Sequence, residues 1–174
     1  MSHDLELFGR IALAALLGFV VGWEREVRGQ LAGDRTFTLV SMGAAAFTAL
    51  SVDAFPGTAE KLIAGIVTGV GFIGAGVVLR TPRGELRGLT TAAAIWAMAA
   101  VGVISGASRP MLATLCAALV LLILELRHVP GLRFLDARRY VGRFRNDAAP
   151  PIVRHDLGGP RSGGNAEGGD PTSR

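Results

Sequence analysis

The stretch LIAGIVTGVGFIGAGVVLRTPRGELRGLTTAAAIW, from Leu62 to Trp96, decides the fold, because it holds two apolar runs joined by an arginine-rich connection. The first run, Leu62 to Leu79, carries no charge over about 18 residues, close to the ~20 residues that cross a ~30 Å hydrocarbon core. In lipid a helix keeps its own hydrogen bonds, so glycines inside it become contact surface. We predict a transmembrane helix held centrally between two neighbours by glycines on both of its faces, namely Gly65, Gly69 and Gly76 on one face and Gly71 and Gly74 on the other.

The same run contains a match to the dinucleotide-binding pattern G-x-G-x-x-G, at residues 69–74. That pattern needs a preceding strand, a helix that opens at the glycines and an acidic residue about 20 positions later. Here both flanks are apolar, and positions 89–99 contain no Asp or Glu. We therefore interpret the glycines as packing positions and not as a nucleotide site.

The composition indicates a small membrane protein with several spans and one bundle. Half of the 174 residues are hydrophobic, and the mean hydropathy is +0.43; both values favour membrane insertion. The 17 arginines flank apolar runs instead of alternating with exposed aromatic residues, so we expect no nucleic-acid partner. The single cysteine, Cys116, has no partner for an internal disulfide or a metal cluster.

The whole chain reads as an all-α membrane protein, a bundle of five transmembrane helices with a short basic, largely disordered cytoplasmic tail. Residues 1–126 form the membrane domain, residues 127–145 are a basic segment suited to an anionic membrane surface, and residues 146–174 are rich in Gly, Pro and charge. A signal peptide is disfavoured at the start, where Asp4 and Glu6 replace a basic region. The five predicted helices cover about Leu5–Trp23, Thr36–Val52, Leu62–Leu79, Gly88–Ser105 and Met111–Leu126.

Small side chains predict where these helices touch. Ala14, Gly18 and Gly22 form a row at a spacing of four residues in the first helix, which suits close helix contact. Asp34 and Thr36 are candidate caps of the second helix. One narrow face of the fourth helix is predicted from Thr90, Ala93, Ala94, Ala97 and Val101.

The distribution of Lys and Arg predicts the orientation in the membrane. With five spans, one side holds the loops after the first and third helices and the tail, with 15 basic residues, against three on the other side, Arg10, Lys61 and Arg109. Positive charge is retained in the cell interior. We expect the amino terminus outside and the carboxyl terminus in the cytoplasm.

Polar residues at the predicted cytoplasmic ends form the candidate site. Two helices begin there, so their positive, donor-bearing ends face the same side. Three alternatives remain open: an anion pocket lined by arginines, attraction of a hydrated cation such as magnesium by carboxylates, or mutual neutralisation of the charges. The candidate residues are Glu24, Arg25, Arg35, Thr36, Thr38, Arg87, Thr90 and Thr91.

The sequence offers no arrangement for catalysis. His3, His128 and His155 lie in terminal or post-membrane segments, and no nucleophile or zinc motif occurs. No predicted span carries an acidic residue in its middle, which disfavours an autonomous ion pump. We expect no enzymatic activity, no cofactor and no metal site.

Four motifs in order resemble the MgtC/SapB family of bacterial inner-membrane proteins. They are Gly22-Trp23-Glu24-Arg25-Glu26, residues 32–40 (AGDRTFTLV), residues 65–80 (GIVTGVGFIGAGVVLR) and residues 87–102 (RGLTTAAAIWAMAAVG). The likeness covers about residues 7–126, which contain all five predicted spans. By motif it adds Gly88 and Trp96 to the packing residues, and it supports the eight polar candidates.

This resemblance implies a multi-pass plasma-membrane protein of magnesium limitation and, in pathogens, survival inside host cells. Family members are not established transporters, and one role proposed for them is restraint of the proton-translocating ATP synthase by contacts inside the membrane. Members of the virulence-factor branch carry a folded cytosolic domain after the fifth helix, and some have a cysteine where this chain has Ala97. Regulation through such a domain is therefore not expected here.

Two functions follow as hypotheses. The first is a protein of magnesium-limitation or acid-stress adaptation, whose partners are the lipid bilayer and other inner-membrane proteins. The second is a small cation (magnesium) or anion transporter or channel, built as a homo-oligomer, with Glu24, Arg35 and Thr90 lining its mouth.

Overall fold

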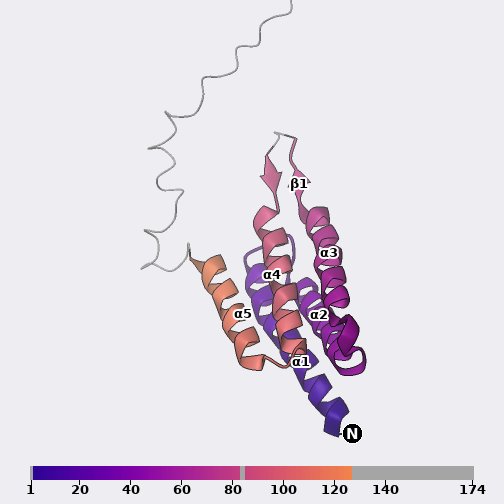
Figure 1. Cartoon of the computed structure of the whole chain (residues 1–174). Helices are drawn as coiled ribbons and strands as arrows, with labels where there is room; N and C mark the ends of the chain where they lie inside the picture. Colours follow the sequence, from indigo (N-terminus) through magenta and orange to yellow (C-terminus); the bar gives the residue numbers. More distant parts are fainter. Residues whose placement is uncertain (1, 83–84, 127–174) are drawn as a thin grey trace, which may run out of the picture. The chain divides into compact units, whose positions relative to one another are not determined.

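The computed structural model describes residues 2–82 and 85–126, and these fold into a helical bundle (Figure 1). Each of the five predicted apolar segments is a helix, so the all-α membrane fold is confirmed. The predictions for residues 127–145 and 146–174 lie outside the described residues. The elements are α1 (Ser2–Val27), α2 (Asp34–Ala54), the 3-10 helix η1 (Pro56–Thr58), α3 (Ala59–Val77), β1 (Leu79–Arg80), β2 (Leu86–Arg87), α4 (Leu89–Gly106) and α5 (Pro110–Glu125).

Four of the helices in the described part of the chain are long and apolar enough to cross a membrane, namely α1, α2, α3 with its preceding turn, and α4. The fifth, α5, is equally apolar but has 16 residues. At about 1.5 Å per residue it is shorter than a ~30 Å hydrocarbon core. A fifth full span is thus a proposal for α5, whereas the other four have the required length.

Helix α1 is longer than the sequence predicted. The segment from Glu24 onward was expected to be a polar connection, yet the helix continues to Val27. Glu24 pairs with Arg28 one turn later, and such a pair in this order supports the last turn of a helix. The polar residues of this segment are therefore held on a helix.

Small residues bring α1 and α2 together, as predicted. A Cβ on Gly18 would lie 2.6 Å from the carbonyl oxygen of Phe37, and one on Gly22 would lie 2.6 Å from the Cα of Asp34. Ala14 is fully buried, and its carbonyl accepts a hydrogen bond of 2.8 Å from the Ser41 hydroxyl. The row Ala14, Gly18 and Gly22 is confirmed as the contact face of α1.

Helix α4 is the central helix of the bundle, and it packs on α2 through glycines. A Cβ on Gly102 would lie 2.3 Å from the carbonyl oxygen of Ser41, and one on Gly106 would lie 2.5 Å from that of Ala45. The small-residue face picked out from the sequence is covered only in part within this chain. Thr90 and Ala93 are exposed and Ala97 is only partly buried, because the contact face is set by larger residues and by the two glycines. The buried residues of α4 are Thr91, Ala94, Ile95, Met98, Ala99, Val101, Gly102, Ser105 and Gly106.

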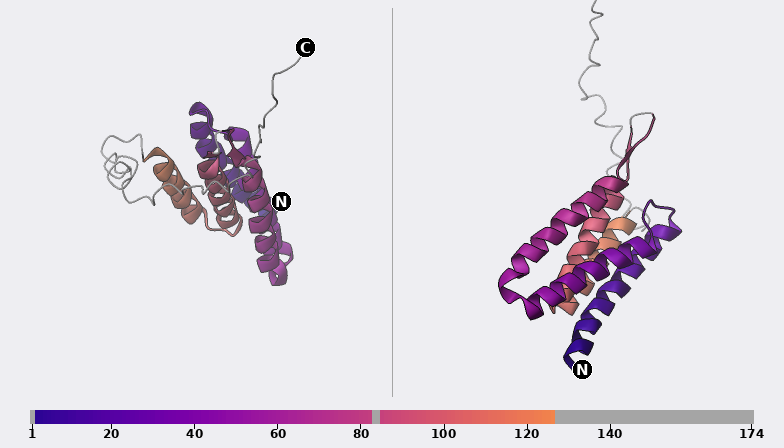
Figure 2. Two further views of the ribbon diagram at one scale, coloured as in Figure 1. Left: turned by 90° about the horizontal axis from the view of Figure 1, so that it is seen from above. Right: turned by 90° about the vertical axis from the view of Figure 1, so that its right-hand side faces the viewer.

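Helix α3 lies at the edge of the bundle and not between two neighbours on opposite faces. Only Val70 and Gly74 of this helix are buried. It packs against α4 and, less extensively, against α2, and its far side is open (Figures 1 and 2). The prediction of a central position was wrong, because glycines on a helix show which faces permit close contact and not which faces this chain itself covers.

The connection between α3 and α4 is a short β-hairpin that the sequence did not predict. Leu79 pairs with Arg87 and Arg80 with Leu86 in antiparallel register. The Thr81 N–H also donates to the carbonyl of Glu85 over 2.9 Å. The hairpin extends the bundle beyond the end of α3 and the start of α4 (Figure 1).

Candidate functional site

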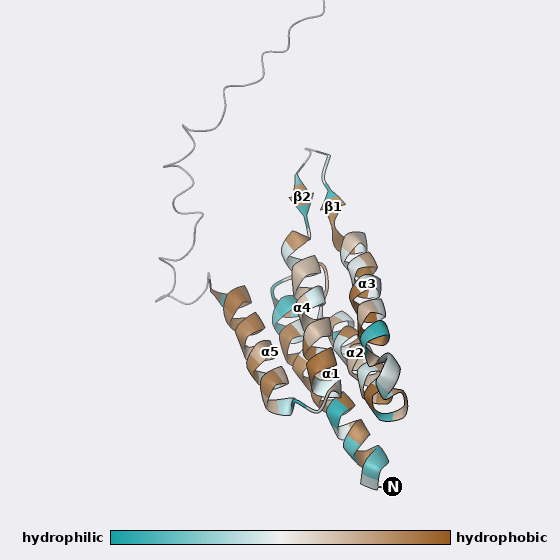
Figure 3. Cartoon of the chain, in the orientation of Figure 1, coloured by the Kyte–Doolittle hydropathy of each residue, from teal (hydrophilic) through white to brown (hydrophobic). Residues whose placement is uncertain are grey.

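The polar candidates gather at one end of the bundle. Helices alternate in direction, so the end of α1, the start of α2, the hairpin and the start of α4 all lie there (Figure 1). In Figure 3 each hairpin strand has a hydrophilic and a hydrophobic part, which correspond to its arginine and its leucine. Gly88 links these parts, since a Cβ there would touch Leu31 of the α1–α2 loop at 3.1 Å and the carbonyl oxygen of Val77 at 2.3 Å.

A network of charges joins α1 to α5 at this end. The Arg28 Nε donates to Glu24 Oε1 over 2.5 Å and to Glu125 Oε1 over 2.9 Å. Arg25 Nη1 lies 3.7 Å from Glu24 Oε2. The hydrogen bond to Glu125, followed by that to Glu24, raises the pKa of Arg28 above its ordinary value. Two arginines and two carboxylates thus neutralise one another across the helix ends.

Arg25 is the buried member of this network, with 5% of its surface exposed. Within the described residues its Nε has no hydrogen-bond partner, and the same holds for Oε2 of Glu24. Buried polar atoms of folded proteins are nearly always hydrogen-bonded to protein or to water. This pair can therefore bind one further polar group or a water molecule.

The other polar candidates are not part of this network. Among the described residues, no hydrogen bond or ion pair joins the side chain of Arg35 or Arg87 to Glu24 or Arg25. The Thr38 hydroxyl donates a hydrogen bond of 2.7 Å to the carbonyl of Asp34, so it bonds within its own helix. Thr36 is partly buried, Thr90 is exposed and Thr91 is buried.

The capping prediction for α2 was wrong. The cap residue is Gly33, and no side chain caps the helix. The Asp34 carboxylate instead accepts a hydrogen bond of 2.6 Å from the backbone N–H of Arg35. Glu26 lies against Gly33 and occupies the space in which a Cβ would stand.

The glycines of α3 differ in what they meet. Gly74 faces Ala92 of α4, where a Cβ would make an ordinary contact at 3.6 Å. Within the described residues nothing lies within 4 Å of a Cβ on Gly65, Gly69, Gly71 or Gly76. Trp96 of α4 is 51% exposed and lines a small apolar pocket between α3 and α4 of about 170 Å³.

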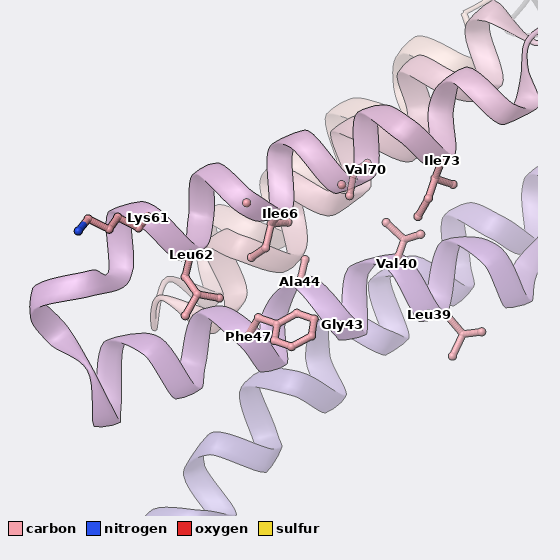
Figure 4. Close-up of a pocket in the computed structure, with 12 residues that line it drawn as sticks. Leu39, Val40, Gly43, Ala44, Phe47, Lys61, Leu62, Ile66, Val70 and Ile73 are labelled. Atoms are coloured by element: carbon pink, nitrogen blue, oxygen red, sulfur yellow. The ribbon is translucent and has the colours of Figure 1, made fainter.

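A larger apolar groove, with a volume of about 680 Å³, runs between α2 and α3 (Figure 4). Val40 and Phe47 of α2 face Leu62 and Ile66 of α3 across it. Lys61 is its one charged lining residue and lies at one end. Sequence reasoning did not predict this groove, because its walls come from two helices whose separation no sequence pattern records.

Sequence reasoning also missed Arg28 and Glu125. The spacing of Glu24 and Arg28, one helical turn apart, was a usable signal for the first. No local signal linked Glu125, 97 residues further along the chain, to Arg28. Among the described residues no group of three or more His, Cys, Asp or Glu side chains is placed to hold a metal ion.

Fold and site together define a membrane protein of packed apolar helices with a charge-paired polar end. The model of the MgtC family matches residues 11–130. This chain belongs to the MgtC family.

Curated relatives agree with this assignment. The chain is 39% identical to Protein MgtC of Brucella abortus (strain 2308) over 151 residues, which cover 83% of this chain and 61% of the relative. It is 45% identical to Protein MgtC of Salmonella typhimurium (strain 14028s) over 93 residues, which cover 53% of this chain and 40% of the relative. The chain thus spans less than two thirds of the length of these relatives. No solved structure matches it.

Proposed function

We propose that this chain is a non-enzymatic protein of the bacterial plasma membrane that serves adaptation to magnesium limitation or acid stress. It acts by contacting other membrane proteins inside the bilayer. Its amino terminus faces outward and its carboxyl terminus the cytoplasm, as the distribution of basic residues favours. The resemblance in sequence makes the proton-translocating ATP synthase the first partner to test.

The observation that carries this proposal is the uncovered outer face of α3. Ala64, Thr68, Gly71 and Ala75 are exposed, and they follow one another at helical spacing on a single side. Phe72, beside them, is 83% exposed. Small residues permit close approach of helix backbones, which is the main source of helix association where water is absent. We call these four residues the outer face of α3.

The experiment replaces Gly71 with leucine, which fills the outer face without touching the rest of the chain. The matched control is Ala118→Leu on α5, an exposed position that then carries the same leucine side chain. Each variant is expressed in a strain that lacks the protein, and growth of that strain is measured at low magnesium and at acid pH. We expect loss of growth with Gly71→Leu alone, at equal amounts of inserted protein.

A photo-crosslinking residue at Ala64 or Ala75 identifies the partner directly. We expect adducts with another membrane protein from these two positions and none from Ala118. Normal growth of Gly71→Leu together with absent adducts would contradict contact through α3.

The alternative function is a small transporter or channel, and the open Oε2 of Glu24 and Nε of Arg25 favour it. A purified sample in sealed liposomes tests it by flux of magnesium and of phosphate. Transport would support this alternative if it were lost in Glu24→Gln and kept in Glu85→Gln, a change in the exposed hairpin. Vesicles that stay tight would exclude it.

A further inference from the structure

The groove between α2 and α3 opens on the side of the bundle and is apolar along its whole length except at one end. Val40 and Phe47 on α2 and Leu62 and Ile66 on α3 form its walls (Figure 4). Gly69 contributes no side chain, and nothing among the described residues lies within 4 Å of a Cβ built on it. In a bilayer an empty space of this kind loses dispersion contacts on all of its walls, so a groove open to lipid is filled.

Lys61 distinguishes this groove from an ordinary lipid-facing surface. It lies at one end, in the first turn of α3, and its ammonium group points away from the apolar walls (Figure 4). The start of a helix carries partial positive charge, so a lysine there is unfavourable without an anion. In the described part of the chain Lys61 makes no ion pair. Glu60 beside it points about 100° further round the helix.

The dimensions of the groove decide what fits. From Lys61 to Ile73 the helix rises about 18 Å at ~1.5 Å per residue. Along that length the groove has a volume of about 680 Å³. A groove of this length with apolar walls accommodates extended hydrocarbon chains.

We infer that the groove binds a phospholipid with an anionic headgroup, its acyl chain lying between α2 and α3 and its phosphate beside Lys61. The lysine supplies the attraction at the membrane surface, as basic residues beside transmembrane helices do for anionic lipids. The apolar walls contact the acyl chain, and the missing side chain at Gly69 leaves room for it. This site lies on the side of α3 that carries Gly69, roughly opposite the outer face with Gly71, and it is independent of the proposed function.

The test measures lipid binding to the purified full chain by native mass spectrometry. The probes are phosphatidylglycerol and phosphatidylcholine with identical acyl chains. A surface lysine contributes about 1 kcal/mol toward an anionic lipid, which is roughly a fivefold change in affinity. We therefore expect Lys61→Gln to weaken phosphatidylglycerol binding about fivefold and to leave phosphatidylcholine binding unchanged. The control Arg109→Gln, another exposed cation, should change neither.

Blocking the groove should act on both lipids. Gly69→Leu places a side chain in the path of the acyl chain, so we expect loss of the retained lipid whatever its headgroup. The control Gly76→Leu adds the same bulk outside the groove and should retain lipid. A phosphatidylglycerol with a photoreactive acyl chain, used with the unchanged protein, should label peptides of α2 and α3 and not of α5.

Equal lipid retention by the unchanged chain, Lys61→Gln and Gly69→Leu would overturn the inference, as would labelling spread evenly over all helices. If Gly69→Leu converts a dimer to a monomer without changing the bound lipid, the groove is a contact between copies and the lipid assignment is wrong. The two proposals can fail separately, because Gly71 belongs to the outer face and not to the groove. Gly71→Leu should abolish growth and leave lipid binding normal.

Discussion

Gly88 shows how a single position holds the polar end together. Its φ of +90° belongs to the left-handed region that L side chains rarely adopt. A Cβ there would also collide with the carbonyl oxygen of Val77, at 2.3 Å. Two independent constraints, backbone angle and close approach, therefore require glycine between β2 and α4.

Replacing Gly88 with alanine tests both constraints. Gly29 has a φ of +61° and open space around its Cβ position, so Gly29→Ala carries the backbone cost without the collision. We expect about 1–3 kcal/mol of destabilisation from a strained backbone position, with Gly88→Ala more destabilising than Gly29→Ala. Unfolding in mixed micelles by sodium dodecyl sulfate measures both free energies. Equal losses of unfolding free energy in the two variants would show that the hairpin shifts to make room for the added methyl group at Gly88.

At the scale of elements, the bundle is organised by two glycine-mediated contacts of α2. One face of α2 receives α1 at Gly18, and another receives α4 at Gly102 and Gly106. Hydroxyl groups add hydrogen bonds between helices: Ser41 of α2 donates to the carbonyl of Ala14 in α1, and Ser105 of α4 donates to the carbonyl of Arg10 in α1 over 2.7 Å. Backbones this close leave no room for a side chain, so these helices cannot slide independently.

Gly102→Ala should damage this packing. Its new methyl group would stand 2.3 Å from the carbonyl oxygen of Ser41, and forcing a group into a packed core costs about 1–3 kcal/mol. Gly9→Ala is the matched control, since nothing lies within 4 Å of that position, and alanine favours a helix by up to about 1 kcal/mol. Unfolding free energies should fall for the first variant and hold or rise for the second. The opposite order would contradict the α2–α4 contact.

Sequence reasoning predicted the elements well and their neighbours less well. The five helices were predictable because each apolar run ends at charged, Pro or Gly residues. The edge position of α3 was not, since Gly71 and Gly76 permit contacts that this chain does not make. The contacts of Gly102 and Gly106 were not predicted, because the run around them is apolar on all sides. Without a charged face, the sequence does not indicate which side of the helix faces its neighbours. Of the candidate site residues, Glu24 and Arg25 form an ion pair, and Arg28 and Glu125, which the sequence did not single out, complete the charge network.

For the whole molecule, the proposed orientation follows from where the basic residues stand. Arg25, Arg28, Arg35, Arg80 and Arg87 are all at the end that carries the hairpin, while Lys61 and Arg109 are at the other. Such an asymmetry keeps the richer end inside the cell. Both ends also carry charged pairs, such as Glu6 with Arg10 at 2.5 Å, so the asymmetry in net charge is smaller than the asymmetry in basic residues.

Cysteine labelling checks this orientation. In a Cys116→Ala background, Gln30→Cys lies in the α1–α2 loop and Gly57→Cys lies in η1 at the opposite end; both positions are exposed. A membrane-impermeant maleimide added to intact cells should label Gly57→Cys and leave Gln30→Cys unlabelled until the membrane is permeabilised. Labelling of Gln30→Cys in intact cells would reverse the proposed arrangement.

Arg28 fastens the last described helix to the first through a contact that water reaches, because its side chain is 31% exposed and that of Glu125 is 27% exposed. Dissolved ions shorten the reach of such an attraction, from about 10 Å at 0.1 M to about 3 Å at 1 M. The ion pair that links the carboxyl end of α5 to α1 therefore weakens as the salt concentration beside the membrane rises. In dilute medium the ion pair contributes more to holding α5 against α1, and in concentrated medium the apolar contacts of α5 supply the larger share.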